Sequence, residues 1–212
     1  MAENLKSIPV TNLDAQPIVV STTGEGSTGK EKVATDFVNP TASNTQWSTY
    51  RLCRFPTDAS VKHVWLFQSG IDTTTAAATI DFNVAFSDAA DDGTPVAFQG
   101  TIPSNKFDGT SLAFISGTGY STAYNSTGTG NKLFGSAIAV LTSGAGQTVD
   151  LTFKNTFTPT MRDDIMYNSL GFVNAQGLQA DPGGWFDILA VLAVAATTAR
   201  TGQIAIEIDY VG

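Results

Sequence analysis

Hydrophobic and polar residues alternate along segment 203–211, near the end of the printed sequence. The large side chains take one set of alternate positions: Ile204, Ile206, Ile208 and Tyr210. Glu207 and Asp209 fall in the other set. A period of two places the large residues on one face of a β-strand and the carboxylates on the other. The segment therefore predicts a strand with one buried face and one solvated face.

The preceding segment, 185–196, does not alternate, because Asp187 is its one charged residue among apolar ones. A strand of this kind must be covered on both faces. The protein's own core supplies one cover, and another layer, another subunit or a partner surface supplies the second. A helix is the alternative, since Ala and Leu favour helices and Asp181-Pro182 suits a helix start. The glycine pair Gly183-Gly184 favours the strand.

Short apolar runs between turn residues predict the remaining strands. These runs occupy residues 18–21, 31–38, 49–55, 60–69, 79–87, 96–98, 111–115, 132–141 and 147–157. Segment 160–170 has apolar residues at helical spacing and predicts the one helix. Asp163 and Asp164 fall in its first turn, where the helix dipole favours negative charge.

These elements predict an all-β fold, an antiparallel β-sandwich with jelly-roll-like topology and one short helix near 160–170. The 20 glycines among 212 residues suit a protein with many turns. Residues 18–212 are expected to form a single sandwich domain, and residues 1–17 an N-terminal arm or edge strand. The order of the strands does not follow from the sequence.

Charge narrows the possible partners. The chain has 11 Lys and Arg against 19 Asp and Glu, a formal net charge of −8, and its basic residues are scattered. A nucleic-acid surface needs clustered basic residues, so nucleic acid is not an expected partner. No apolar run reaches the length of a membrane span, so no membrane contact is expected. Residues 1–10 lack the apolar core of a signal peptide, which favours synthesis in a cytoplasm and leaves release in an assembled particle open.

The two residues with the most reactive side chains predict no catalytic site. Cys53 is the single cysteine, lies in an apolar strand-like run and is expected to be buried and inert. His63 is the single histidine, so the sequence offers no histidine pair for a metal. We expect it inside the sheet or at its edge. No catalytic, cofactor-binding or metal site is therefore predicted.

Two loops resemble ligand sites without meeting their requirements. Gly24, Gly29 and Lys30 have the spacing of a phosphate-binding loop, but Glu31 stands where that loop needs Ser or Thr. The run that follows favours a strand, so we expect a hairpin loop. Turn 88–95 holds three aspartates but not the spacing of a calcium loop, which predicts an ordinary Asp/Gly turn.

Three segments together resemble small virion-associated proteins of tailed bacteriophages. They are AFSDAADDGTP (85–95), LGFVNAQGLQADPGGWFDI (170–188) and TGQIAIEIDYV (201–211). The resemblance implies a β-sandwich that decorates or stabilises the phage head, with the major capsid protein as partner and the virion as location. It also implies a homo-oligomer, commonly a trimer at a capsid symmetry axis. The family has no catalytic residues to transfer.

The expected function is that of a structural virion protein, which binds capsid through shape and apolar contacts without chemistry. The alternative is a carbohydrate- or host-receptor-binding β-sandwich module. It is suggested by Tyr120 and Tyr124 in the Gly/Ser/Thr-rich loop 117–131, because tyrosines on polar loops can stack on sugars. An enzyme is the least expected class, since no acid/base pair stands out.

Overall fold

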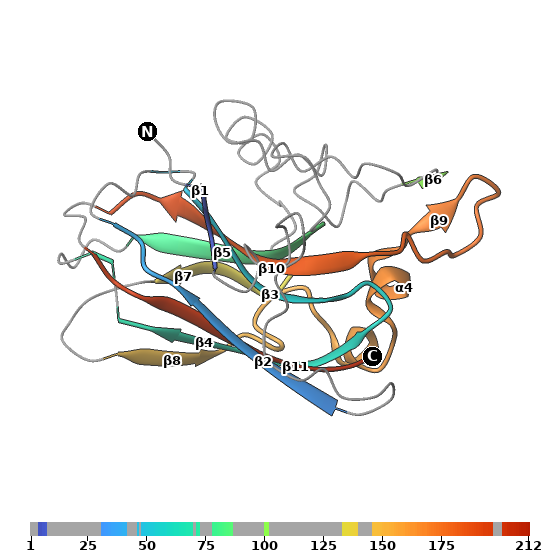
Figure 1. The fold of residues 1–212 in the computed structure, drawn as a ribbon, viewed down its shortest axis with the longest axis horizontal. Helices are drawn as coiled ribbons and strands as arrows, with labels where there is room; N and C mark the ends of the chain where they lie inside the picture. Colours follow the sequence, from blue (N-terminus) through green and yellow to red (C-terminus); the bar gives the residue numbers. More distant parts are fainter. Residues whose placement is uncertain are drawn as a thin grey trace, which may run out of the picture.

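Two β-sheets stack face to face and form a sandwich (Figure 1). The computed structural model describes residues 4–7, 31–41, 46, 48–69, 71–72, 78–86, 100–101, 133–139, 146–196 and 201–212. The expected strands 18–21, 96–98 and 111–115 and the loops discussed above lie outside these residues, apart from Glu31.

The first layer is a five-stranded sheet. Its strands, in spatial order, are β1 (Asn4–Lys6), β3 (Thr49–Pro56), β10 (Trp185–Val194), β5 (Thr79–Phe86) and β7 (Gly135–Ala139). β1 runs parallel to β3, and the other neighbours are antiparallel. The N-terminal residues 4–6 thus form an edge strand of this sheet.

The second layer is a four-stranded antiparallel sheet. Its order is β2 (Glu31–Val38), β11 (Ile204–Val211), β4 (Ser60–Gln68) and β8 (Gln147–Asp150). A separate pair joins the two-residue strands β6 (Gly100–Thr101) and β9 (Val173–Asn174). Two short helices, α3 (Pro159–Arg162) and α4 (Met166–Leu170), follow β8.

The strand order is that of a jelly roll. β2 pairs with β11, β3 with β10, β4 with β8 and β5 with β7, so the chain is arranged as one long hairpin. Rolling this hairpin adds the pairs β10 with β5 and β11 with β4, which complete the two sheets. The predicted all-β, jelly-roll-like sandwich is confirmed.

The core lies between the sheets and contains the residues that the alternating pattern placed there. Ile204, Ile206 and Ile208 have no exposed surface. Phe55 of β3 lies 5.9 Å from Phe186 of β10 and 6.1 Å from Tyr210 of β11, measured between ring centroids. This aromatic contact joins the two layers directly.

β10 is a strand with both faces buried, as its apolar sequence predicts, and the helical alternative is wrong. Ile188 and Leu192 point into the core, while Leu189 and Val191 on the opposite face are equally inaccessible. The second cover is present within this single chain. The burial of β10 therefore does not require another subunit or a partner.

Three predicted elements differ from the structure. The helix expected over 160–170 is two short helices, and Asp163 caps the end of the first instead of lying in a first turn. Segment 147–157 forms a strand only to Asp150, because Thr152 then folds back and its Oγ1 accepts a hydrogen bond from the Val64 N–H at 3.1 Å. In β4, strict alternation predicts that Val61 shares a face with His63, but a register shift places Val61 in the core and His63 on the opposite face.

Candidate functional site

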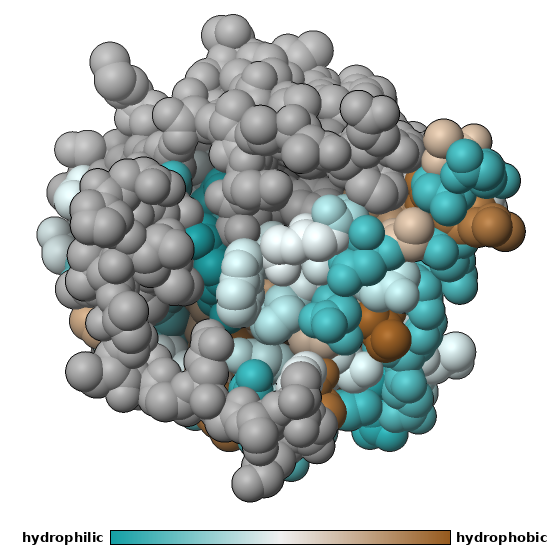
Figure 2. Space-filling view, turned by 45° about the vertical axis from the view of Figure 1, so that its right-hand side comes forward, coloured by the Kyte–Doolittle hydropathy of each residue, from teal (hydrophilic) through white to brown (hydrophobic). Residues whose placement is uncertain are grey.

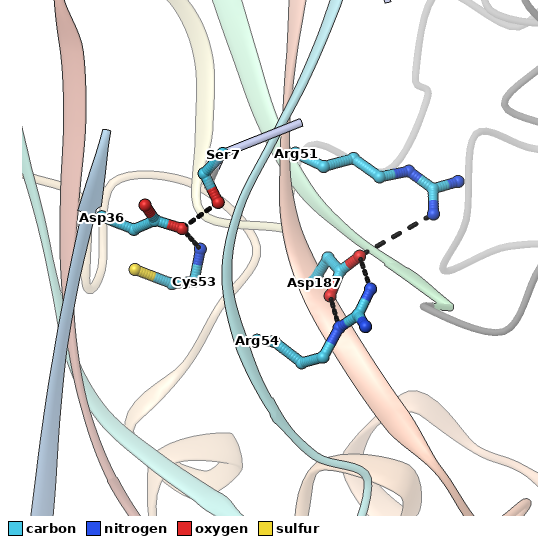
Figure 3. Close-up of polar contacts among 6 residues, drawn as sticks. All are labelled: Ser7, Asp36, Arg51, Cys53, Arg54 and Asp187. Carbon is cyan, nitrogen blue, oxygen red and sulfur yellow. Dashed lines mark hydrogen bonds and ion pairs between the residues drawn. The ribbon is translucent and has the colours of Figure 1, made fainter. Parts of the chain in front are cut away.

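Three charged side chains meet on the outer face of the five-stranded sheet. Asp187 of β10 lies between Arg51 and Arg54 of β3 (Figure 3). Its carboxylate accepts two hydrogen bonds from Arg54, at 2.7 and 3.0 Å, and lies 3.7 Å from Arg51. The Asp187 side chain is fully buried, and those of the arginines are 4% and 5% exposed. A buried carboxylate needs such partners, because desolvation without them is costly.

A β-bulge in β3 brings both arginines to the same face. Arg54 pairs with Asp187 and Leu52 pairs with Ile188, which leaves Cys53 as the extra residue on β3. Cys53 has a φ of 39°, in the left-handed region. In a regular strand, residues three apart lie on opposite faces, so the bulge is what allows both guanidinium groups to reach one carboxylate.

A second buried network lies on the inner side of β3 (Figure 3). Asp36 of β2 accepts hydrogen bonds from the Ser7 hydroxyl, from the Cys53 N–H at 3.1 Å and from the Phe37 N–H at 2.8 Å. The Ser7 N–H also donates to the Arg51 carbonyl at 3.0 Å. Asp36 thus links the end of β1 and the β3 bulge to the four-stranded sheet.

Replacing Asp36 by asparagine is expected to remove a pH-dependent part of the stability. Burial raises the pKa of Asp36, and this outweighs the hydrogen bonds that lower it. A carboxyl with a raised folded-state pKa stabilises the protein at low pH, and that contribution is lost as pH rises through the folded pKa. Urea unfolding at several pH values should show the wild type gaining stability over Asp36→Asn as the solution is acidified from neutral. A difference independent of pH would contradict this expectation.

Cys53 is buried, as predicted, and its environment disfavours the thiolate. Burial raises the pKa of Cys53 well above its ordinary value, and nearby carboxylates, first among them Asp36, add to the effect. Its thiol lies 3.3 Å from the Ile206 carbonyl oxygen and 3.4 Å from that of Ala34. Because the thiolate is the nucleophilic form, these contacts suit a structural role.

His63 lies on the outer face of β4, opposite Asp209 of β11. It lines a shallow recess of about 300 Å³ with Glu31, Lys62, Arg162, Asp163 and Val211.

Among the described residues, no group of three or more His, Cys, Asp or Glu side chains is arranged to hold a metal ion. In the same part of the chain, no helix combines the length and hydropathy needed to cross a membrane.

The outer face of the four-stranded sheet is open, in contrast to that of the five-stranded sheet. Three large apolar side chains on it are substantially exposed: Val33 at 63%, Phe37 at 45% and Phe67 at 37%. On the side of the molecule drawn in Figure 2, hydrophobic residues form separate patches within a mainly hydrophilic or neutral described surface. We define the open face as the outward residues of β2, β11, β4 and β8.

A second recess, also of about 300 Å³, lies where β4 ends and β8 begins. It is lined by Phe67, Gln68, Ser69, Gly146, Gln147, Thr148 and Gln203. The Gln68 amide nitrogen donates to the Gln147 side-chain oxygen at 2.8 Å and to the Ala139 carbonyl at 3.0 Å. Its Oε1 is buried and has no hydrogen-bond donor among the described residues. An aromatic ring beside several amides and hydroxyls suits a neutral polar ligand.

Comparison with known proteins gives structural likenesses only. No protein-family model matches the chain, and no curated protein matches it in sequence. A chain of the capsid of Ralstonia phage GP4 is similar, with a TM-score of 0.47, 13% identity and coverage of 98% of this chain and 97% of that chain. A chain of the cyanophage Pam1 capsid asymmetric unit has a TM-score of 0.39, 15% identity and coverage of 93% and 96%. At these values, function has to be argued from the chain's own residues.

The buried charge networks were not predicted as sites. Asp187 was the available signal, since a lone carboxylate in an apolar strand needs a buried partner. The bulge that turns Arg51 and Arg54 toward it depends on the pairing of β3 with β10, and Arg54 and Asp187 are 133 residues apart in sequence. Tyr120, Tyr124 and the aspartates of turn 88–95 lie outside the described residues.

Proposed function

We propose that this chain is a structural protein of a tailed-bacteriophage particle, which decorates or stabilises the head by binding the major capsid protein. The observation that carries the proposal is the unequal exposure of the two sheets. The central parts of β3 and β10 in one sheet are buried on both faces, whereas the other sheet presents Val33, Phe37 and Phe67 to solvent. Such exposed apolar groups are typical of surfaces that bind other proteins. The three segments that resemble virion-associated proteins supply the phage context.

In this role the chain works through shape and contact, without catalysis or a cofactor, and acts as a homo-oligomer, with a trimer as the expected state. It requires no nucleic acid or membrane. Its location is the virion, after synthesis in the host cytoplasm. A β-sandwich fold by itself does not carry this function, so the test must be made on particles.

The test is retention on purified particles of the phage that encodes the chain. After density-gradient purification and extensive washing, mass spectrometry should detect the chain in a fixed ratio to the major capsid protein. Recombinant chain should also bind particles that lack it, and native mass spectrometry should show a trimer. Recovery of the chain from infected-cell lysate but never from washed particles would refute the proposal.

The recess beside Phe67 favours a second candidate, a carbohydrate- or receptor-binding module. Phe67 offers an exposed ring, and the exposed side chains of Gln147 and Thr148 offer an amide and a hydroxyl beside it. Rings stack on the apolar faces of sugars, and amides pair with their hydroxyls. On a glycan array, binding by the wild type should be weakened by Gln147→Ala and retained by Gln176→Ala, which changes an exposed residue outside the recess. An array without signal would exclude this candidate.

A further inference from the structure

The open face has a regular chemical pattern across three neighbouring strands. In the first row, Ala205 of β11 lies between Phe37 of β2 and Phe67 of β4. Ala205 has a small side chain, so the two rings, 45% and 37% exposed, are the large apolar groups of this row. This row offers a partner an apolar contact with an aromatic group on each side.

The second and third rows of the face carry its charge. Glu207 lies between Thr35 and Trp65, and Asp209 lies between Val33 and His63. Asp150 of β8 is the neighbour of Trp65 on the far side of the second row. The carboxylates are therefore adjacent to the aromatic row, and the face combines apolar contact with negative charge.

The charged groups around Asp209 show that the carboxylates repel one another. Burial raises the pKa of Asp209 most, and Glu207 and Glu31 raise it further, while His63 lowers it. Lys62, a cation on the adjoining strand β4, donates a hydrogen bond to the Arg162 carbonyl at 2.9 Å. A cation supplied by a partner would relieve the repulsion.

The same charges argue against a second copy of this chain as the occupant. Two open faces brought together would oppose carboxylate to carboxylate, and each chain has a formal net charge of −8. Like charges brought together across an interface are strongly unfavourable. The chemistry of the face instead matches a surface that pairs aliphatic side chains with Lys or Arg.

We propose that the open face docks a basic, partly apolar protein surface, in which aliphatic side chains contact Phe37 and Phe67 and a Lys or Arg pairs with Glu207 and Asp209. This inference rests on the proposed function, under which the partner is the major capsid protein. It identifies the surface of the chain that faces the shell.

Binding to particles that lack the chain tests this assignment. Phe37→Ser should weaken binding roughly thirty-fold, the effect expected for an aromatic anchor at the centre of an interface. Glu207→Gln should weaken it roughly tenfold and make it less sensitive to salt, because one charge pair is lost. The matched control is Leu178→Ser, which removes a side chain that is 65% exposed but lies outside the open face. The control should bind as the wild type does, and urea midpoints should show that all variants are folded.

The outcomes separate the two proposals. If wild-type chain fails to bind particles, the proposed function is refuted. If wild type binds and the Phe37 and Glu207 variants bind equally well, another surface faces the shell and this inference is refuted. A change in oligomeric state without loss of particle binding would also refute it, because the face would then join copies of the chain.

Site-specific crosslinking gives an independent readout. Thr35 is an exposed residue of the open face, and the buried Cys53 should not compete for a thiol-reactive reagent. Thr35→Cys labelled with a photocrosslinker should yield a product with a capsid peptide that contains Lys or Arg. Gln176→Cys, also exposed but outside the face, should not. The reverse pattern would overturn the assignment.

Discussion

Replacing Asp187 by alanine is expected to lower the free energy of unfolding by about 3–5 kcal/mol. The substitution removes the carboxylate that pairs with Arg54 and Arg51 and leaves two guanidinium groups buried without it. The loss comes mainly from the desolvation of guanidinium groups that no longer have this carboxylate beside them. Urea unfolding followed by tryptophan fluorescence would measure the change, with Trp185 and Trp65 as natural probes.

Asp163→Ala is the matched control for this substitution. The Asp163 side chain is 67% exposed and lies 3.3 Å from Arg162, so its loss should change the stability by less than about 0.5 kcal/mol. Replacing the Arg54–Asp187 pair by Met and Leu together should cost less than Asp187→Ala, since the Arg54 charge is then removed with its carboxylate and only Arg51 loses a partner. Similar losses for Asp187→Ala and Asp163→Ala would show that the buried pair does not stabilise the fold.

Replacing Phe55 by alanine is the second change with a large expected effect, a loss of about 3–5 kcal/mol. Phe55 has no exposed surface and contacts rings from both layers, Phe186 and Tyr210. Its removal leaves a cavity where the sheets meet, and the rigid strands around it cannot close the gap. Thermal and urea unfolding would both report the loss.

Phe37→Ala provides the comparison for the core substitution. The Phe37 side chain is 45% exposed on the open face, so the same chemical change there should cost less than about 1 kcal/mol. Phe55→Leu should lie between the two alanine variants, because it fills part of the cavity. Equal losses for Phe55→Ala and Phe37→Ala would contradict the assignment of the core.

The sequence predicted the elements whose pattern is local. Segment 31–38 coincides with β2, and the alternation after Gln203 gave both the strand β11 and its buried face. The apolar run 185–196 correctly indicated a strand covered on both sides. In each case the period of the side chains follows directly from strand geometry, so no knowledge of distant partners is needed.

Features that depend on distant partners were not predictable in the same way. The jelly-roll order pairs β2 with β11, which are far apart in sequence, and alternation does not identify the partner of a strand. The bulge at Cys53 and the shift at Val61 each reverse the faces expected from a period of two. The helix over 160–170 is interrupted where Asp164 Oδ1 accepts a hydrogen bond from the Ile165 N–H at 2.8 Å, next to the start of α4.

The sequence predicted only part of the open face. The pattern after Gln203 placed Glu207 and Asp209 on a solvated face, and they lie there. Phe37 and Phe67 flank Ala205 because of the register of three strands. This register cannot be deduced from the pattern of a single sequence. The placement of the two rings on either side of Ala205 was therefore visible only in the assembled sheet.

The central strands β10 and β11 follow, in sequence order, the strands that they join. β10 lies between β3 and β5, and β11 lies between β2 and β4. Neither sheet can therefore form as a whole before residues 185–211 have been synthesised. On a ribosome, the earlier strands must wait for these two before the layers can close. The fold can therefore be completed only once synthesis has passed residue 211, and nascent chains that stop before residue 185 should depend on chaperones to avoid aggregation.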